Sequence, residues 1–72
     1  MKIYQRLKDL REDMDLMQSD VAKVLGVKQE QYSRYERGIF EIKFNQVIIL
    51  AKFYNVSIDY IAGLTNDKSK KW

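Results

Sequence analysis

The segment 29–37 carries side chains that can pair with the edges of nucleic-acid bases. On a helical wheel, Tyr32 and Tyr35 fall on one side, and the opposite side presents Gln29, Glu30, Ser33, Arg34 and Arg37. A glutamine can make paired hydrogen bonds to adenine, an arginine can do so to guanine, and a glutamate can accept from cytosine. An ordinary solvated helix also has such a face, so its meaning depends on the elements that hold it.

The composition argues against catalysis and metal binding. The 72 residues include no Cys and no His, which excludes thiol and imidazole chemistry and the usual zinc, copper, haem and iron–sulfur sites. Asp9, Glu12, Asp13 and Asp15 cluster at the end of a predicted helix without a base beside them, as in a solvated face. We therefore expect no enzyme activity, no cofactor and no metal.

Charge and hydropathy indicate a soluble, cytoplasmic protein. Thirteen basic and ten acidic residues give a net charge of +3, which suits a polyanionic partner but is ordinary for a small domain. No apolar run approaches the ~20 residues of a membrane span, and the N-terminus lacks the apolar core of a signal peptide. We expect no membrane association.

Hydrophobic spacing predicts one all-α domain of five short helices, with few forced turns because the chain has no Pro. We place the helices at 2–14, 18–25, 29–37, 44–54 and 58–62. The first has the inward stripe Ile3, Leu7, Leu10 and Met14, and the fourth has Phe44, Val47, Ile48, Ala51 and Tyr54. Gly26 and Asn55 suit left-handed helix ends, and Ser57 suits an N-cap. The domain covers residues 1–65, and residues 66–72 form a basic C-terminal tail.

The second and third predicted helices meet through a short turn, as in a helix-turn-helix unit. In the twenty residues from Gln18 to Arg37, the fifth is the small Ala22 and the ninth is Gly26. A small residue lets two helices approach closely, and glycine accepts the positive φ that the turn needs. The inward positions are Val21, Leu25, Val27, Tyr32 and Tyr35. A plain αα-hairpin is the alternative, and the number of matched positions disfavours it.

The stretches RLKDLRED, QSDVAKVLGV, YSRYERG and LAKFYNVSIDYIAGLT cover nearly the whole chain and resemble the lambda repressor-like, XRE-type helix-turn-helix family. The resemblance implies a compact five-helix domain whose second helix crosses the DNA backbone while the third enters the major groove. It implies base reading by Gln29, Glu30 and Arg34, to which the helical wheel adds Ser33. It also implies a partly buried ion pair between Arg11 and Glu36.

Contacts to phosphate are predicted for Gln18, Lys28, Arg37, Lys43 and Asn45. In the family, the glutamine at the start of the second helix touches phosphate and can brace the recognition helix, here through Gln29. The stretch after Gly38 departs from the family pattern, because Ile39 and Phe40 stand where relatives often have Lys or Arg. We therefore expect modest DNA affinity for a monomer.

Four apolar residues have no place in the predicted monomer core: Ile49, Phe53, Tyr60 and Leu64. An exposed apolar patch usually marks an interface, so we expect a homodimer, with coverage by the tail and Trp72 as the alternative. The expected function is regulation of transcription, with a repressor binding a pseudo-palindromic operator in double-stranded DNA through the major groove. The alternative is a protein-binding module, such as an antitoxin or an anti-repressor, on the same fold.

Overall fold

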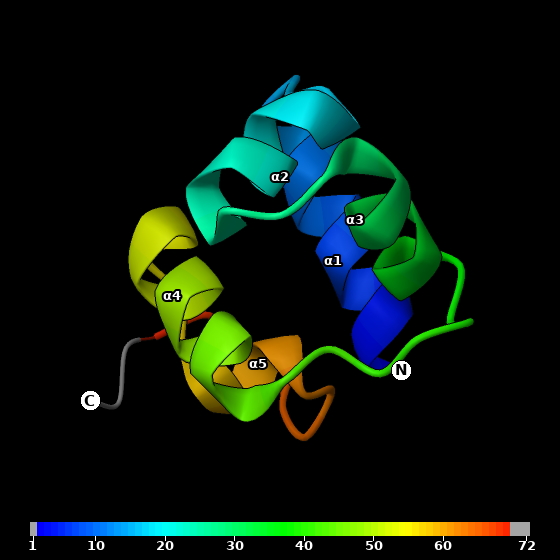
Figure 1. Ribbon diagram of the computed structural model, residues 1–72. Helices are drawn as coiled ribbons and strands as arrows, with labels where there is room; N and C mark the ends of the chain where they lie inside the picture. Colours follow the sequence, from blue (N-terminus) through cyan, green and yellow to red (C-terminus); the bar gives the residue numbers. More distant parts are fainter. Residues whose placement is uncertain (1, 70–72) are drawn as a thin grey trace.

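The computed structural model describes residues 2–69 and contains five helices and no strand in that range. They are α1 (Ile3–Asp13), α2 (Gln18–Leu25), α3 (Gln29–Glu36), α4 (Phe44–Tyr54) and α5 (Ile58–Ile61). The principal packing partners are α1 with α3, α3 with α2, α2 with α4, α4 with α5, and α5 with α1. The helices therefore close a ring around one core (Figure 1). The predicted all-α, five-helix fold is confirmed.

Local signals account for most helix ends. Gly26 and Asn55 have φ of 70° and 60° and end α2 and α4 in the left-handed conformation. The Ser57 hydroxyl accepts a hydrogen bond from the Tyr60 amide at 2.9 Å and caps α5.

Four helices begin at residues that are poor N-caps, Lys2, Met17, Lys28 and Lys43, and three of them, α1, α2 and α4, are supported from inside the first turn. The backbone N–H of Lys2, Met17 and Lys43 donates to Gln5, Asp20 and Gln46, three residues later in each case. These bonds are the returning half of a capping box, in which the side chain at the third helical position accepts from the cap backbone. They compensate for the missing Ser or Thr at the start of α1, α2 and α4.

The core takes side chains from all five helices and from Val56. Its buried apolar residues are Leu7, Leu10, Val21, Ala22, Tyr32, Tyr35, Val47, Leu50, Ala51, Tyr54, Val56 and Ile61. Leu50 is fully enclosed, whereas Ile48, expected to face inward, lies at the half-buried edge.

Two residues predicted to face the core lie outside it. Phe44 is 69% exposed, because it is the first residue of α4 and helical side chains lean toward the N-terminus, here beyond the end of the packed stripe. Met14 is 52% exposed, because α1 ends at Asp13 and the backbone then turns through Asp15 at φ 55°. Leu16 packs against the core in its place.

Arg6 on α1 holds the residues that follow α5. Its guanidinium donates to the carbonyls of Tyr60 and Thr65 at 3.1 and 3.2 Å and to Asn66 Oδ1 at 2.7 Å. It also lies 4.0 Å from the centroid of the Tyr60 ring. The sequence offered one signal for this buried arginine: position 6 lies on the inward stripe, three residues after Ile3.

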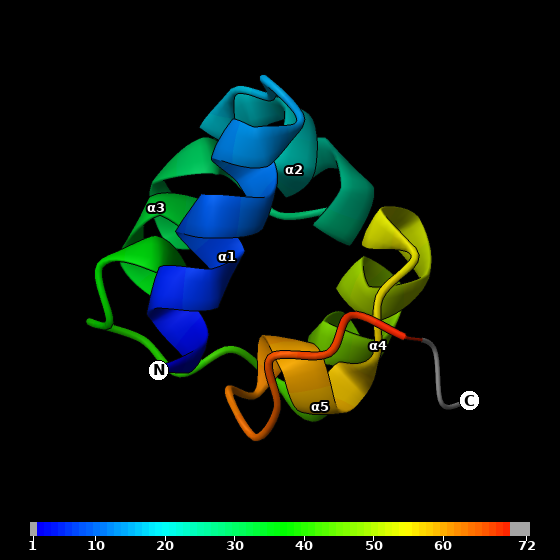
Figure 2. The ribbon, with the colours of Figure 1, turned by 180° about the vertical axis from the view of Figure 1, so that it is seen from behind.

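The first residues of the predicted tail lie against the domain. The Ser57 amide donates to the Lys68 carbonyl at 3.2 Å, and the returning segment crosses beside α5 and α4 (Figure 2). Trp72 lies outside the described residues, so the idea that it covers the apolar patch stays untested, and the boundary at Thr65 stays a prediction. Within the described part of the chain, no helix has the length and apolar character needed to cross a membrane.

Candidate nucleic-acid interface

The α2–α3 unit has the turn that its sequence predicts. Gly26 has φ 70° and ψ 30°, and the Val27 amide donates to the Ala22 carbonyl at 3.0 Å. A Cβ at Gly26 would have no atom within 4 Å beyond its immediate neighbours, so backbone conformation and not lack of space calls for glycine. Val21 and Ala22 of α2 and Tyr32 and Tyr35 of α3 are buried in the common core. The two helices are therefore held as one unit.

The polar face of α3 is accessible to solvent. Gln29, Glu30 and Arg37 are exposed, and Ser33 and Arg34 are half-buried. The Arg34 guanidinium lies 5.4 Å from the centroid of the Phe40 ring, in the loop after α3. Arg37 Nε donates to the Ser33 carbonyl at 3.4 Å, a long bond at the exposed end of the helix. The residues predicted to read bases thus share one accessible surface.

The residues predicted to touch phosphate lie at helix starts and at the end of α3. Lys28 and Lys43 occupy the N-cap positions of α3 and α4, Asn45 lies in the first turn of α4, and all three are exposed. Gln18 is the first residue of α2, where free backbone N–H groups favour an anion. Its side chain does brace α3, but Nε2 donates to Glu36 Oε1 at 3.1 Å and not to Gln29 as predicted.

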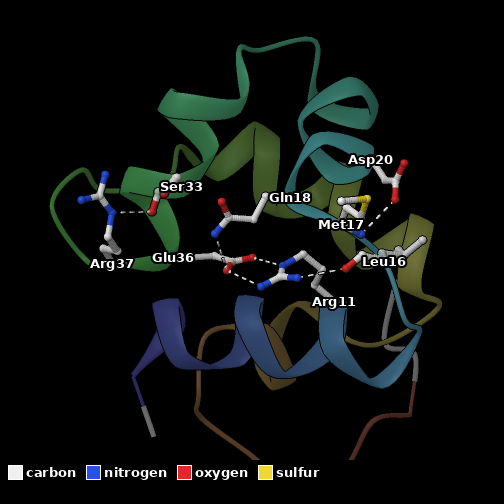
Figure 3. A network of polar contacts seen from close by, with 8 residues as sticks. All are labelled: Arg11, Leu16, Met17, Gln18, Asp20, Ser33, Glu36 and Arg37. Carbon is white, nitrogen blue, oxygen red and sulfur yellow. Dashed lines mark hydrogen bonds and ion pairs between the residues drawn. The ribbon is translucent and has the colours of Figure 1, made fainter.

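Arg11 and Glu36 form the ion pair that joins α1 to α3 (Figure 3). Arg11 Nε and Nη2 donate to the two Glu36 carboxylate oxygens at 2.7 and 3.0 Å, a bidentate arrangement. Arg11 Nη1 donates to the Leu16 carbonyl at 2.9 Å. The two side chains are only 13% and 3% exposed. Together with Gln18, the pair connects α1, the start of α2 and the end of α3.

The electrostatics of this network keep both partners charged. Burial alone would raise the pKa of Glu36, but the hydrogen bonds and charge of Arg11, together with the polar groups of Tyr32 and Gln18, outweigh burial and leave that pKa lowered. The hydrogen bond to Glu36 raises the pKa of Arg11. Burial and the nearby carboxylate raise the pKa of Tyr32, which keeps its hydroxyl neutral. The network is therefore an ionised and largely buried junction behind the polar face of α3.

The four residues of the predicted dimer patch do not share one environment. Ile49, Phe53 and Leu64 are exposed. Tyr60 is half-buried, packs against the core and carries the Arg6 guanidinium over its ring. The expectation that Tyr60 has no place in the monomer core is therefore wrong, and the physical reason is its stack with Arg6. The accessible apolar residues that remain are Ile49 and Phe53 on α4 and Leu64 after α5.

Comparison with known proteins gives one family. A model of the helix-turn-helix family matches residues 7–61. The chain is 37% identical over 67 residues to YobD of Bacillus subtilis, an uncharacterized HTH-type transcriptional regulator, covering 93% of this chain and 60% of YobD. It is 43% identical over 53 residues to the cryptic phage CTXphi transcriptional repressor RstR of Vibrio cholerae, covering 74% of this chain and 48% of RstR.

An antitoxin is also among the relatives. The antitoxin PezA of Streptococcus pneumoniae is 33% identical over 61 residues, with coverage of 85% of this chain and 39% of PezA. The chain thus spans between 39% and 60% of the length of these three proteins.

A solved structure supports the same fold. The crystal structure of the P22 c2 repressor, determined in complex with a synthetic operator, superimposes with a TM-score of 0.80 and 23% identity. The match covers 90% of this chain and 98% of the repressor chain. The identity is low enough that this likeness speaks for the fold alone. With the family match over most of its length, this chain belongs to the lambda repressor-like, XRE-type helix-turn-helix family.

Proposed function

We propose that this protein is a sequence-specific regulator of transcription, a repressor, that reads an operator in double-stranded DNA with α3 in the major groove. The observation that carries the proposal is the accessible polar face of α3, held in a helix-turn-helix whose back is locked by Arg11 and Glu36. A rigid helix presents its side chains in a fixed pattern, which is what discrimination among base pairs requires. The names of YobD and RstR support regulation and repression for this chain.

In this proposal, Gln29, Glu30, Ser33 and Arg34 face base edges. Arginine can donate two hydrogen bonds to a guanine, and glutamine can make paired bonds to an adenine. Glu30 accepts from a cytosine or excludes other bases, since its carboxylate also repels phosphates.

Five residues around α3 fit contacts to the phosphate backbone. Lys28 and Lys43 bring exposed ammonium groups to the starts of α3 and α4, and Arg37 brings a guanidinium to the end of α3. Gln18 and Asn45 supply neutral donors at the starts of α2 and α4. Such contacts set register on the duplex without reading sequence.

The decisive experiment selects bound duplexes from a random pool and then compares wild type with Arg34→Ala. On the selected duplex, loss of a bidentate guanine contact should weaken binding about 5- to 150-fold and relax the preference at one base pair. On random DNA, the loss should be much smaller. Arg37→Ala is the matched control, because loss of a phosphate contact weakens binding to both duplexes alike. An equal loss of affinity for both duplexes in Arg34→Ala would mean that Arg34 contacts only phosphate and reads no base.

We further propose that the working form is a homodimer built on the outer side of α4 and on the residues after α5. The exposed apolar side chains of Ile49, Phe53 and Leu64 support it, and two recognition helices about 34 Å apart can read successive major grooves.

Sedimentation of Ile49→Lys/Phe53→Glu tests the dimer. This variant should be a helical monomer that has lost tight operator binding. Met14→Lys/Met17→Glu makes the same chemical change on exposed apolar residues of the α1–α2 turn and should leave sedimentation unchanged. A wild type that sediments as a monomer at high micromolar concentration contradicts the proposal.

The similarity to PezA favours one alternative, a protein-binding module of the antitoxin kind. Such a module would use its exposed apolar residues on a protein partner. Failure of the wild type to bind any duplex at low salt would favour this alternative, because the electrostatic part of DNA binding is strongest there.

A further inference from the structure

The loop after α3 folds back onto Arg34. Gly38 has φ +74°, and its amide donates to the Tyr35 carbonyl at 3.2 Å. The amides of Ile39 and Phe40 then both donate to the Arg34 carbonyl, at 3.0 and 3.3 Å. The backbone of Phe40 is therefore fixed relative to the backbone of Arg34, although the two residues belong to different elements.

The side chains of these residues also meet. The Arg34 guanidinium carbon lies 5.4 Å from the centroid of the Phe40 ring, within the range of a cation–π contact. Phe40 is 46% exposed, and it also lines an apolar cleft of about 540 Å³ with Tyr4, Tyr35 and Ile42. The ring thus has support from the body of the domain while it contacts the guanidinium.

Arg34 differs in this respect from Gln29 and Glu30 on the same helix, which are exposed where Arg34 is half-buried. Arginine has many rotamers, and ordering them on binding costs affinity unless the side chain is already ordered in the free protein. A ring 5.4 Å from the guanidinium restricts those rotamers before DNA arrives. The phenyl ring has no oxygen or nitrogen acceptor, so this contact uses none of the guanidinium N–H donors in a conventional hydrogen bond.

We propose that Phe40 is a positioning residue that orders the Arg34 guanidinium for base recognition and so contributes to operator specificity from outside the recognition helix. This inference rests on the proposed DNA-binding function and adds a specificity-determining residue to it. It also gives a use to the half-exposed ring of Phe40 in the loop after α3. In this proposal Phe40 affects specificity through Arg34 and does not itself contact DNA.

The stack can be tested without DNA. In the free protein, the ring current of Phe40 should shift the NMR resonances of the Arg34 Cδ protons and the Nε–H group upfield. Phe40→Leu, which keeps apolar bulk in the cleft, should remove the shift, and Phe40→Tyr should keep it. Ile39→Ala is the control, because it truncates a neighbouring exposed side chain and leaves the ring in place. Unchanged Arg34 resonances in Phe40→Leu would overturn the inference.

The effect on recognition is measured as the ratio of affinities for the selected duplex and a scrambled one. Phe40→Leu should lower this ratio about two- to fivefold, the range expected for an exposed cation–π contact, while Phe40→Tyr and Ile39→Ala preserve it. In an Arg34→Ala background, Phe40→Leu should change the ratio no further. A loss of the same size in that background would mean that Phe40 contacts DNA itself and would overturn the positioning role.

The two levels of failure are distinguishable. A wild-type protein with no preference among duplexes overturns the proposed function and this inference with it. A selective wild type whose preference survives Phe40→Leu overturns the inference alone. Thermal unfolding of each variant by circular dichroism confirms that the comparison is made between folded proteins.

Discussion

Removal of one partner from the Arg11–Glu36 pair should be among the most destabilising polar substitutions in this domain. Arg11→Met keeps the apolar stem but removes both guanidinium hydrogen bonds from the 3% exposed Glu36 carboxylate and leaves it only neutral neighbours such as the Gln18 amide (Figure 3). Stranding a buried charge in this way costs about 3–5 kcal/mol. The free energy of unfolding of a domain is about 0.05–0.15 kcal/mol per residue, so for this chain it is roughly 4–11 kcal/mol. The substitution should therefore remove a large part of the stability.

Urea unfolding followed by circular dichroism supplies the measurement. Arg11→Met, Glu36→Gln and the double variant complete a double-mutant cycle, in which contacting residues show coupling of about 0.5–3 kcal/mol. We expect the double variant to be more stable than the sum of the single effects predicts. Asp13→Asn is the control and should change the free energy of unfolding by only ~0–1 kcal/mol. Asp13 pairs with Lys68 at 4.0 Å, and both side chains are mostly exposed. Strict additivity of the two substitutions would refute the pairing argument.

The pH dependence gives an independent check. The folded-state pKa of Glu36 is lowered from its ordinary value of 4.5, so its stabilising contribution is complete above pH 4.5 and is lost as the pH falls through the lower folded-state pKa. In Arg11→Met, burial dominates and should raise the pKa of Glu36, so the carboxyl then favours the folded state at low pH. The stability difference between wild type and Arg11→Met should therefore shrink on acidification from pH 7 to pH 4. A difference that stays constant with pH would contradict this account.

Three further predictions concern positions where local geometry sets the expected cost. Arg6→Lys keeps the charge but loses the forked donors and the ring stack, so it should cost ~2–3 kcal/mol and speed amide exchange in residues 65–69. Gly38→Ala should cost more than Gly26→Ala in urea unfolding, because both add ~1–2 kcal/mol of left-handed strain but only a Cβ at Gly38 meets the Tyr4 ring, at 3.0 Å. Ser57→Ala should cost ~1 kcal/mol in urea unfolding through loss of the α5 cap.

Elements with strong local signals agreed with their sequence-based predictions. Gly26 and Asn55 end α2 and α4 in the left-handed conformation, and Ser57 caps α5. Such signals act over a few residues, because a cap or a turn is satisfied by its own neighbours. The helix-turn-helix unit was predictable for the same reason, since its constraints lie within twenty consecutive residues.

The predictions of burial are wrong for two residues at helix ends. Periodicity places Phe44 and Met14 on apolar stripes, yet both are exposed, because hydrophobic spacing does not reveal where the packed part of a helix ends. The opposite error concerned Tyr60, which was assigned to the surface. Its partner Arg6 is 54 residues away in the chain and supplies both a ring contact and a hydrogen bond to the Tyr60 carbonyl.

The fold class, the helix-turn-helix and the chemistry available on α3 can be predicted from the amino-acid sequence, because each follows from the order of residue types along a short segment. The partners of those residues become visible only in the folded domain. Folding brought Gln18 to Glu36, seated Arg6 on Tyr60 and set the Phe40 ring against Arg34. Contacts of this kind depend on how the helices and loops fold back and close the ring around the core, and one sequence does not encode that geometry in any local pattern.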